Sequence, residues 1–306
     1  HDCLPGSAID RVYTQTQARY AQLHLEALHR IEEQKQFLAA GLNADGMEKP
    51  VAVFNPAPVD RTEYLERDGR ELPVSVPAYG ITVADLGKAQ PITRTDRQGR
   101  ILENDWIRLS FCVDGTVDSL YDKCAEREML PAGQRGNRLL CFPDENTHWD
   151  IEKAYLDRPG QPARLLTMER YDRGAGQFLH MTFQVGKVST ITQTVRLNKN
   201  SARVDFRTEV SWQEEYQMLR VRWPVDVVAE SAACDIQFGH VFRPTHHNTS
   251  WDQAKFEVCA HTWADISDRS GGLALLNDCK YGYKLWDNVL DLCLLRSQNC
   301  PCEHGD

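Results

Sequence analysis

Histidine is the residue type best suited to chemistry in the densest polar segment of this chain, residues 238–282. Four histidines lie within about twenty residues of one another: His240, His246, His247 and His261. Because neutral imidazole is a common zinc ligand, this cluster raises a metal-site hypothesis. Its spacing matches no known ligand pattern, however, and adjacent side chains on a strand point to opposite faces of a sheet. We therefore favour loop histidines held by hydrogen bonds.

Tryptophan and acidic residues raise a second hypothesis, which is sugar binding. Indole faces stack on pyranoses while Asn and Asp side chains bind neighbouring hydroxyls, and the candidate tryptophans are Trp149, Trp251 and Trp263. Taken singly, such tryptophans more often pack in a core. Glycoside hydrolysis needs two carboxyl groups roughly 5 to 10 Å apart, but spacing along the chain cannot choose a pair among 44 acidic residues. Neither a G-x-S-x-G motif nor a P-loop occurs.

The first element that must position these residues is a long helix, predicted over residues 7–42. Ser7 resembles an N-cap, apolar residues then recur near a 3.6-residue period, and Gly41 provides a stop signal. One amphipathic helix cannot bury its apolar stripe alone. We therefore expect its partner helices to lie upstream of His1, in a longer protein.

From Val51 onwards the sequence has the character of a β protein. Short runs rich in β-branched and aromatic residues alternate with Gly, Pro, Asn and Asp. Asp114-Gly115 between two apolar runs predicts a hairpin turn. Strand after strand without helical patterns between them predicts antiparallel sandwiches. Strands are expected at residues 51–54, 80–86, 107–113, 189–197, 203–212, 219–223, 272–276 and 289–295.

Composition excludes several classes of protein. The chain has 306 residues with 35 basic and 44 acidic side chains, a formal charge of -9. Such an acidic chain repels phosphate backbones, so no nucleic-acid partner is expected. No apolar run approaches the 18 residues or so of a membrane span, so no membrane partner is expected either. Ten scattered cysteines without paired C-x-x-C motifs are typical of free thiols in a reducing compartment.

Several segments together resemble the glycoside hydrolase family 38 α-mannosidases. The most specific is residues 238–252, FGHVFRPTHHNTSWD, which is similar to the family's F-G-x-x-x-R-P-T-H-x-N-T-S-W-D motif. Residues 1–7, HDCLPGS, resemble its H-D-x-L-P-G-[ST] segment. Further similar segments run from one end of the chain to the other: Val53 to Pro56 with Arg61, Leu102 to Asn104 with Gly115 and Asp122, Trp149 to Ile151, Phe256-Glu257, His261 with Trp263, Ala274 to Gly282, and Leu294 to Ser297.

The resemblance implies a fold and a division into domains. The fold class is mainly β: an N-terminal helix, the remnant of a helical bundle, followed by antiparallel β-sandwich domains that form a supersandwich. The predicted domains are residues 1–45, a helical segment of the bundle, residues 46–98, a small β domain, and residues 99–306, a large β-sandwich. The family's N-terminal α/β barrel has no counterpart in this chain, because the His-x-Asp sequence at His148 to Asp150 falls in the β region.

The resemblance also implies a function. Family members are metal-dependent retaining exo-α-mannosidases, which release terminal α-D-mannose from glycans and bind Zn²⁺, or Co²⁺ in some cytosolic members. It places a metal ligand at His1 and substrate-binding residues at Asp2 and, less directly, Arg296. The catalytic nucleophile and acid belong to the barrel, so we predict that the 306 residues alone are inactive. The alternative hypothesis is a non-catalytic carbohydrate-binding β-sandwich module.

The resemblance extends to partners and location. The expected partners are mannose-containing oligosaccharides. Self-association into a homo-oligomer is compatible with the resemblance. The central motif is most similar to the cytosolic or vacuolar type of the family, so we expect a cytoplasmic or a vacuolar or lysosomal protein, with the cytoplasm favoured.

Overall fold

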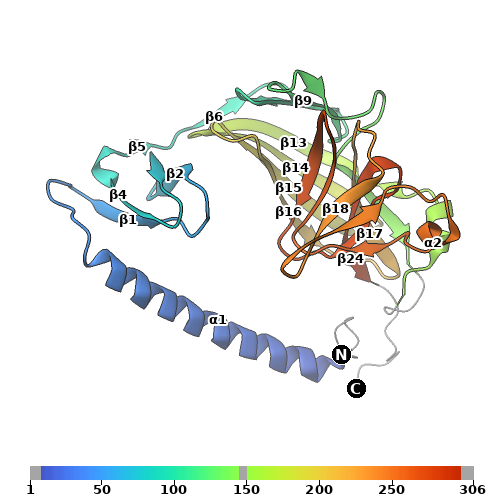
Figure 1. The fold of residues 1–306 in the computed structure, drawn as a ribbon, viewed down its shortest axis with the longest axis horizontal. Helices are drawn as coiled ribbons and strands as arrows, with labels where there is room; N and C mark the ends of the chain where they lie inside the picture. Colours follow the sequence, from blue (N-terminus) through green and yellow to red (C-terminus); the bar gives the residue numbers. More distant parts are fainter. Residues whose placement is uncertain (1–7, 145–149, 298–306) are drawn as a thin grey trace. The chain divides into compact units, whose positions relative to one another are not determined.

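The computed structural model describes residues 8–144 and 150–297, shown as a ribbon in Figure 1. These residues form two compact units. One contains residues 8–95 and 172–175, and the other contains residues 96–144, 150–171 and 176–297. Within the described part of the chain, no helix has the length and apolar character needed to cross a membrane.

The predicted helix is present as α1 (Asp10–Ala39), 30 residues long. It starts later than Ser7, and its N-cap is Ile9, whose side chain cannot accept a hydrogen bond from the first turn. The C-cap is Ala40, next to the predicted stop at Gly41. None of its residues is buried, and its large apolar side chains are all exposed. The periodicity therefore predicts the helix correctly, and the stripe lies uncovered.

The smaller unit also contains two short antiparallel sheets. The first pairs β1 (Pro50–Phe54) with β4 (Ile81–Asp85). The second has the order β2 (Arg61–Arg67), β3 (Arg70–Val76) and β5 (Gln90–Pro91). Asp68 and Gly69 both have positive φ, 51° and 70°, which is the geometry that joins two strands by a tight hairpin. A small core of Val74, Val76 and Ala84 holds the unit together.

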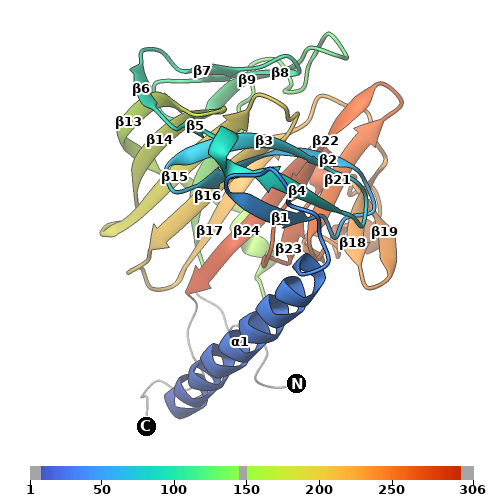
Figure 2. The same cartoon turned by 90° about the vertical axis from the view of Figure 1, so that its left-hand side faces the viewer.

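The larger unit contains four sheets whose described strand pairs are antiparallel, as predicted (Figures 1 and 2). The first has the order β10-β9-β8-β7, with β7 (Ile101–Glu103), β8 (Ile107–Phe111), β9 (Val117–Asp122) and β10 (Arg127–Glu128). The second has the order β16-β15-β14-β13-β6, with β6 (Arg94–Arg97), β13 (Arg164–Arg173), β14 (Gly176–Val185), β15 (Ser189–Asn198) and β16 (Val204–Ser211).

The other two sheets carry the segments of chemical interest. The six-stranded sheet has the order β12-β11-β17-β24-β23-β20, with β11 (Arg138–Pro143), β12 (Gln161–Pro162), β17 (Gln217–Pro224), β20 (Val258–Cys259), β23 (Gly282–Lys284) and β24 (Val289–Ser297). The last has the order β19-β18-β21-β22, with β18 (Ser231–Ile236), β19 (Gly239–Pro244), β21 (Trp263–Asp268) and β22 (Gly271–Leu276). Short helical turns lie between strands along the chain: η1 (Leu86–Lys88) in the smaller unit, and η2 (Lys153–Asp157), α2 (Ser250–Gln253) and η3 (Trp286–Asn288) in the larger one.

One hydrophobic core joins the four sheets of the larger unit. It includes Leu109 of β8, Leu179 of β14, Leu219 of β17 and Ile266 of β21, all fully buried. Along β14 and β15 buried and half-buried residues alternate, because successive side chains point to opposite faces of a strand. The mainly β, sandwich-like fold class is therefore confirmed.

The hairpin predicted at Asp114-Gly115 is also confirmed, since it joins β8 to β9. Gly115 has φ +83°, and a Cβ there would lie 2.7 Å from the ring of Phe183. The turn therefore requires glycine for two reasons, its backbone conformation and its packing against β14.

Candidate functional site

Three residues were assigned to a site by resemblance, and the structure describes one of them. His1 and Asp2 lie outside the described residues, as do His148 and Trp149. Arg296 lies on β24, next to the edge of the described chain. The metal and sugar contacts expected of His1 and Asp2 therefore stay predictions.

Two residues hold the guanidinium of Arg296: Asp144, just before segment 145–149, and Asp150, just after it. Its Nε and Nη2 donate to the two carboxylate oxygens of Asp144, at 2.6 and 3.0 Å, and Nη2 also donates to the carbonyl oxygen of Asp150 at 2.9 Å. The Asp144 side chain is only 3% exposed. Such a bidentate pair fixes the guanidinium plane as well as its position. Arg296 thus ties together the residues on either side of segment 145–149.

Polar residues in the family-like segments mostly hold loops. Asn55 is buried: its Nδ2 donates to the carbonyl oxygens of Val59, Val76 and Pro77, and its Oδ1 accepts from the amide of Ala57. A buried amide satisfied in this way stabilises a turn.

Two further segments of this kind have the same role. Asn277 Nδ2 donates to the Tyr283 hydroxyl at 2.7 Å while its Oδ1 accepts from the amides of Cys279 and Lys280. In the central motif, Thr249 accepts a hydrogen bond from the amide of Asp252 and so caps α2. Contacts of this sort agree with a structural role for residues 248–252.

A buried ionic network lies on one face of the six-stranded sheet. Arg220 of β17 and Asp291 of β24 have side chains that are 0% exposed, and Arg220 Nε lies 2.6 Å from Asp291 Oδ1. Arg222 Nε reaches the other oxygen of Asp291 at 2.5 Å. Glu257, 14% exposed, lies 2.8 Å from Arg220 Nη1. The hydroxyl of Tyr155, in η2, donates to Glu257.

The protonation of this network follows from burial and from its two arginines. Burial alone would raise the pKa of Asp291, but the charges of Arg220 and Arg222 outweigh burial and hold this pKa below its usual value. Burial raises the pKa of Glu257, and Arg220 offsets only part of that effect. Burial also raises the pKa of Tyr155. Because the Arg220 and Asp291 side chains have no exposed surface, this pair cannot contact a sugar, and removal of either partner would leave the other charge buried without its main partner.

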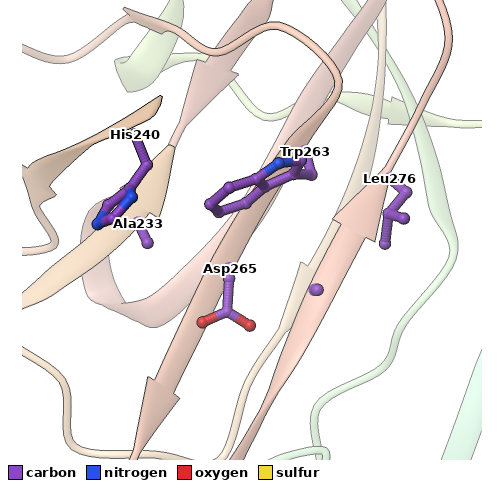
Figure 3. Close-up of a pocket in the computed structure, with 6 residues that line it drawn as sticks. Ala233, His240, Trp263, Asp265 and Leu276 are labelled. Carbon is purple, nitrogen blue, oxygen red and sulfur yellow. The ribbon is translucent and has the colours of Figure 1, made fainter. Parts of the chain in front are cut away.

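A shallow pocket lies on the outward face of the sheet β19-β18-β21-β22 (Figure 3). Its volume is about 510 Å³, and it is lined by Ala233, His240, Trp263, Asp265, Ala274 and Leu276. Trp263 lies between His240 and Leu276, with Asp265 beside it. This arrangement offers an aromatic surface and a carboxylate, which are the groups of a sugar-binding pocket.

A larger hollow of about 930 Å³ lies in the same unit and shares Ala274 and Leu276 with this pocket. Core side chains such as Trp223 and Leu292 line it, together with Arg203 before β16, Asp205 of β16 and Lys280 after β22. Arg203 and Asp205 form an ion pair at 2.7 Å, so two of its charged groups neutralise each other.

The histidines that raised the metal hypothesis have separate surroundings. His240 contacts the rings of Phe242 and Trp263, and His261 contacts Tyr281. His246 Nδ1 lies 3.5 Å from Asp252, and His247 packs against Trp286. Among the residues that the structure describes, no three His, Cys, Asp or Glu side chains gather as metal ligands.

The sequence pattern predicts Trp263 and His240 as candidate residues but gives no indication of Asp265, Arg220 or Asp291. Asp265 could have been found, because Trp263 and Asp265 alternate with the buried residues Ala264 and Ile266 and so share an outward face. The buried network could not, because a charged residue on a strand normally indicates a solvated face.

Comparison with known proteins identifies the family. Residues 102–303 match the model of the glycosyl hydrolases family 38 C-terminal domain. The chain is 40% identical over 229 residues to alpha-mannosidase G of Dictyostelium discoideum, an alignment that covers 70% of this chain and 21% of that protein. It is 33% identical over 335 residues to alpha-mannosidase 2C1 of Mus musculus, covering 100% of this chain and 31% of that protein. The chain therefore spans between about a fifth and a third of the length of these relatives.

Solved structures agree on the fold. The crystal structure of an alpha-mannosidase from Enterococcus faecalis V583 superposes with a TM-score of 0.60 at 15% identity, over 82% of this chain and 33% of that one. A second Enterococcus faecalis protein, described as belonging to glycosyl hydrolase family 38, also gives a TM-score of 0.60, at 14% identity, over 86% of this chain and 37% of that one. The family model covers most of the chain, and this chain belongs to glycosyl hydrolase family 38.

Proposed function

We propose that this chain is part of a metal-dependent retaining exo-α-mannosidase that releases terminal α-D-mannose from glycans. The observation that carries the proposal is the match of residues 102–303 to the family 38 C-terminal domain. Relatives named alpha-mannosidases, aligned along the whole chain at 33% identity, support it. Because the chain spans at most 31% of these relatives, the proposal concerns the activity of a longer protein.

Retaining hydrolysis uses one carboxylate as nucleophile and a second carboxyl group as acid and then base. We propose that both come from outside these 306 residues, and that the chain alone does not turn over mannosides. The family resemblance supports this, because it places the nucleophile and the acid in an N-terminal barrel.

A metal ion, Zn²⁺ or Co²⁺, belongs to the proposal through His1, which would be one of its ligands. The metal would hold sugar hydroxyls and so orient the ring. Asp2 would bind the hydroxyls as well. Arg296 would contribute to substrate binding, with Asp144 keeping its guanidinium in a single orientation.

The proposed substrates are mannose-containing oligosaccharides, and the proposed location is the cytoplasm, as expected from the similarity to the cytosolic or vacuolar type. The chain's charge of -9 supports partners other than nucleic acid. Self-association into a homo-oligomer is compatible with this function.

The test is turnover of p-nitrophenyl α-D-mannopyranoside with Zn²⁺ or Co²⁺ present. These 306 residues should show none alone. A chimera in which they replace the aligned segment of mouse alpha-mannosidase 2C1 should be active. In the chimera, His1→Ala should lose bound metal and turnover, whereas His29→Ala, at a histidine 76% exposed on α1, should keep both. Turnover by the chain alone, or a folded chimera without turnover, would contradict the proposal.

A further inference from the structure

The register of one sheet builds the pocket on its outward face. Asp265 of β21 pairs with Ala233 of β18 on one side and with Ala274 of β22 on the other. Because the two flanking side chains are single methyl groups, the row leaves a hollow around the Asp265 carboxylate. The next row carries Trp263, which pairs with Leu276.

The indole of Trp263 is half-buried and supported by its neighbours. Its ring centroid lies 6.3 Å from that of His240, with 40° between the ring planes, and His240 in turn meets the edge of Phe242 at 5.2 Å. Leu276 lies on the other side of the indole (Figure 3). A ring held in place before binding loses little conformational entropy when a ligand stacks on it.

Polar groups in the pocket have hydrogen-bonding capacity to spare. Asp265 Oδ1 accepts from the Ser267 hydroxyl at 2.6 Å. Within residues 8–144 and 150–297, the structure gives Asp265 Oδ2 no donor and gives the His240 ring nitrogens no hydrogen-bond partner. A carboxylate oxygen accepts from hydroxyls, and an imidazole both donates and accepts. The pocket therefore presents acceptors and a donor beside an aromatic face.

We propose that this pocket binds a neutral pyranose unit of an oligosaccharide. Stacking on Trp263 would bury the apolar face of the ring, while Asp265 and His240 would bind its hydroxyls. A volume of about 510 Å³ suits a ligand of one or two sugar units. The Asp265 carboxylate and the chain's charge of -9 disfavour acidic sugars. The site needs neither metal nor nucleophile, so it stands independently of the proposed hydrolysis.

The experiment is a titration of the purified chain, labelled with ¹⁵N-tryptophan, with methyl α-D-mannopyranoside and α-linked mannobiose. The indole N–H signal of Trp263, assigned from its loss in Trp263→Ala, should shift and saturate. Trp263→Ala should abolish the binding isotherm measured by calorimetry. Asp265→Asn, which keeps the shape of the side chain, should weaken binding about tenfold, because it replaces a charge-assisted hydrogen bond.

The control is Trp106→Ala, since Trp106 is half-buried like Trp263 and does not line the pocket. This variant should bind the sugars like the wild type, and circular dichroism should show that all the variants are folded. If neither sugar shifts the indole N–H signal of Trp263, the proposal is wrong. So would a signal that moves only with protein concentration, which would make the pocket an interface between copies. Neither the NMR signal nor the calorimetric isotherm depends on hydrolysis. The sugar-binding proposal and the mannosidase proposal can therefore be refuted independently.

Discussion

Substitution of Asp291 by asparagine should be strongly destabilising, because it removes the carboxylate that two arginines share. The Asp291 and Arg220 side chains are 0% exposed and their charged atoms lie 2.6 Å apart. Breaking a buried pair of this kind by removing one partner costs about 3–5 kcal/mol. Arg220 would keep Glu257, at 2.8 Å, as a partner. The lower end of the range applies for that reason, and we expect a loss of about 3 kcal/mol.

The assay is urea unfolding at pH 7, followed by tryptophan fluorescence. All seven tryptophans belong to residues 96–301, so the signal reports on the larger unit. The midpoint should fall by about 1 M or more. A matched control is Asp205→Asn, which breaks the exposed Arg203–Asp205 pair at 2.7 Å and should cost less than about 1 kcal/mol. If Asp291→Asn cost no more than this control, the buried network would not stabilise the sheet as we argue.

Three further predictions concern a turn, an acidic group and the thiols. In urea unfolding, Gly115→Ala should lower the free energy of unfolding by about 1 kcal/mol or more beyond the loss caused by Gly99→Ala. Both glycines have positive φ, but only at Gly115 would a Cβ lie 2.7 Å from the ring of Phe183. Equal losses in the two variants would contradict the packing argument. Hydrogen bonds from Ser270 hold the pKa of Asp268 at about 2, below its usual 3.8. Its contribution to stability should therefore be complete above about pH 4 and lost as the pH falls toward 2, and Asp268→Asn should flatten the acid dependence of the urea midpoint between pH 5 and pH 2. Burial raises the pKa of Cys141 and of Cys234 to about 11. When the chain is treated with iodoacetamide at about pH 8, mass spectrometry should show that the exposed thiols of Cys124 and Cys259 are alkylated first. Early alkylation of Cys141 or Cys234 would contradict their burial.

Local patterns were enough to predict most of the fold. The predicted strand at residues 189–197 corresponds to β15 (Ser189–Asn198), and that at residues 289–295 corresponds to β24 (Val289–Ser297). Alternation and turn residues act within a few positions of one another, so a single sequence contains that information. The packing of α1 could not be predicted in the same way. A stripe of apolar residues indicates that the helix packs against a partner but does not identify that partner.

The candidate site depended more on contacts between distant strands. Arg220 and Asp291 come together because β17 pairs with β24, and Asp265 and Ala233 because β21 pairs with β18. Such pairings are fixed by tertiary structure and leave no signal in the spacing of one sequence. The roles of His1, Asp2 and Arg296 were predicted from family resemblance alone and stay predictions.

The most direct test of the central claim is the stereochemistry of mannose released by the chimera that carries these 306 residues. Proton NMR of the first product formed from an α-mannoside, before the anomers equilibrate, distinguishes α-mannose from β-mannose. We predict α-mannose, since a retaining mechanism inverts the anomeric carbon twice. β-Mannose as the first product, or no release of mannose by a folded, metal-loaded chimera, would contradict the assignment of this chain to a retaining α-mannosidase.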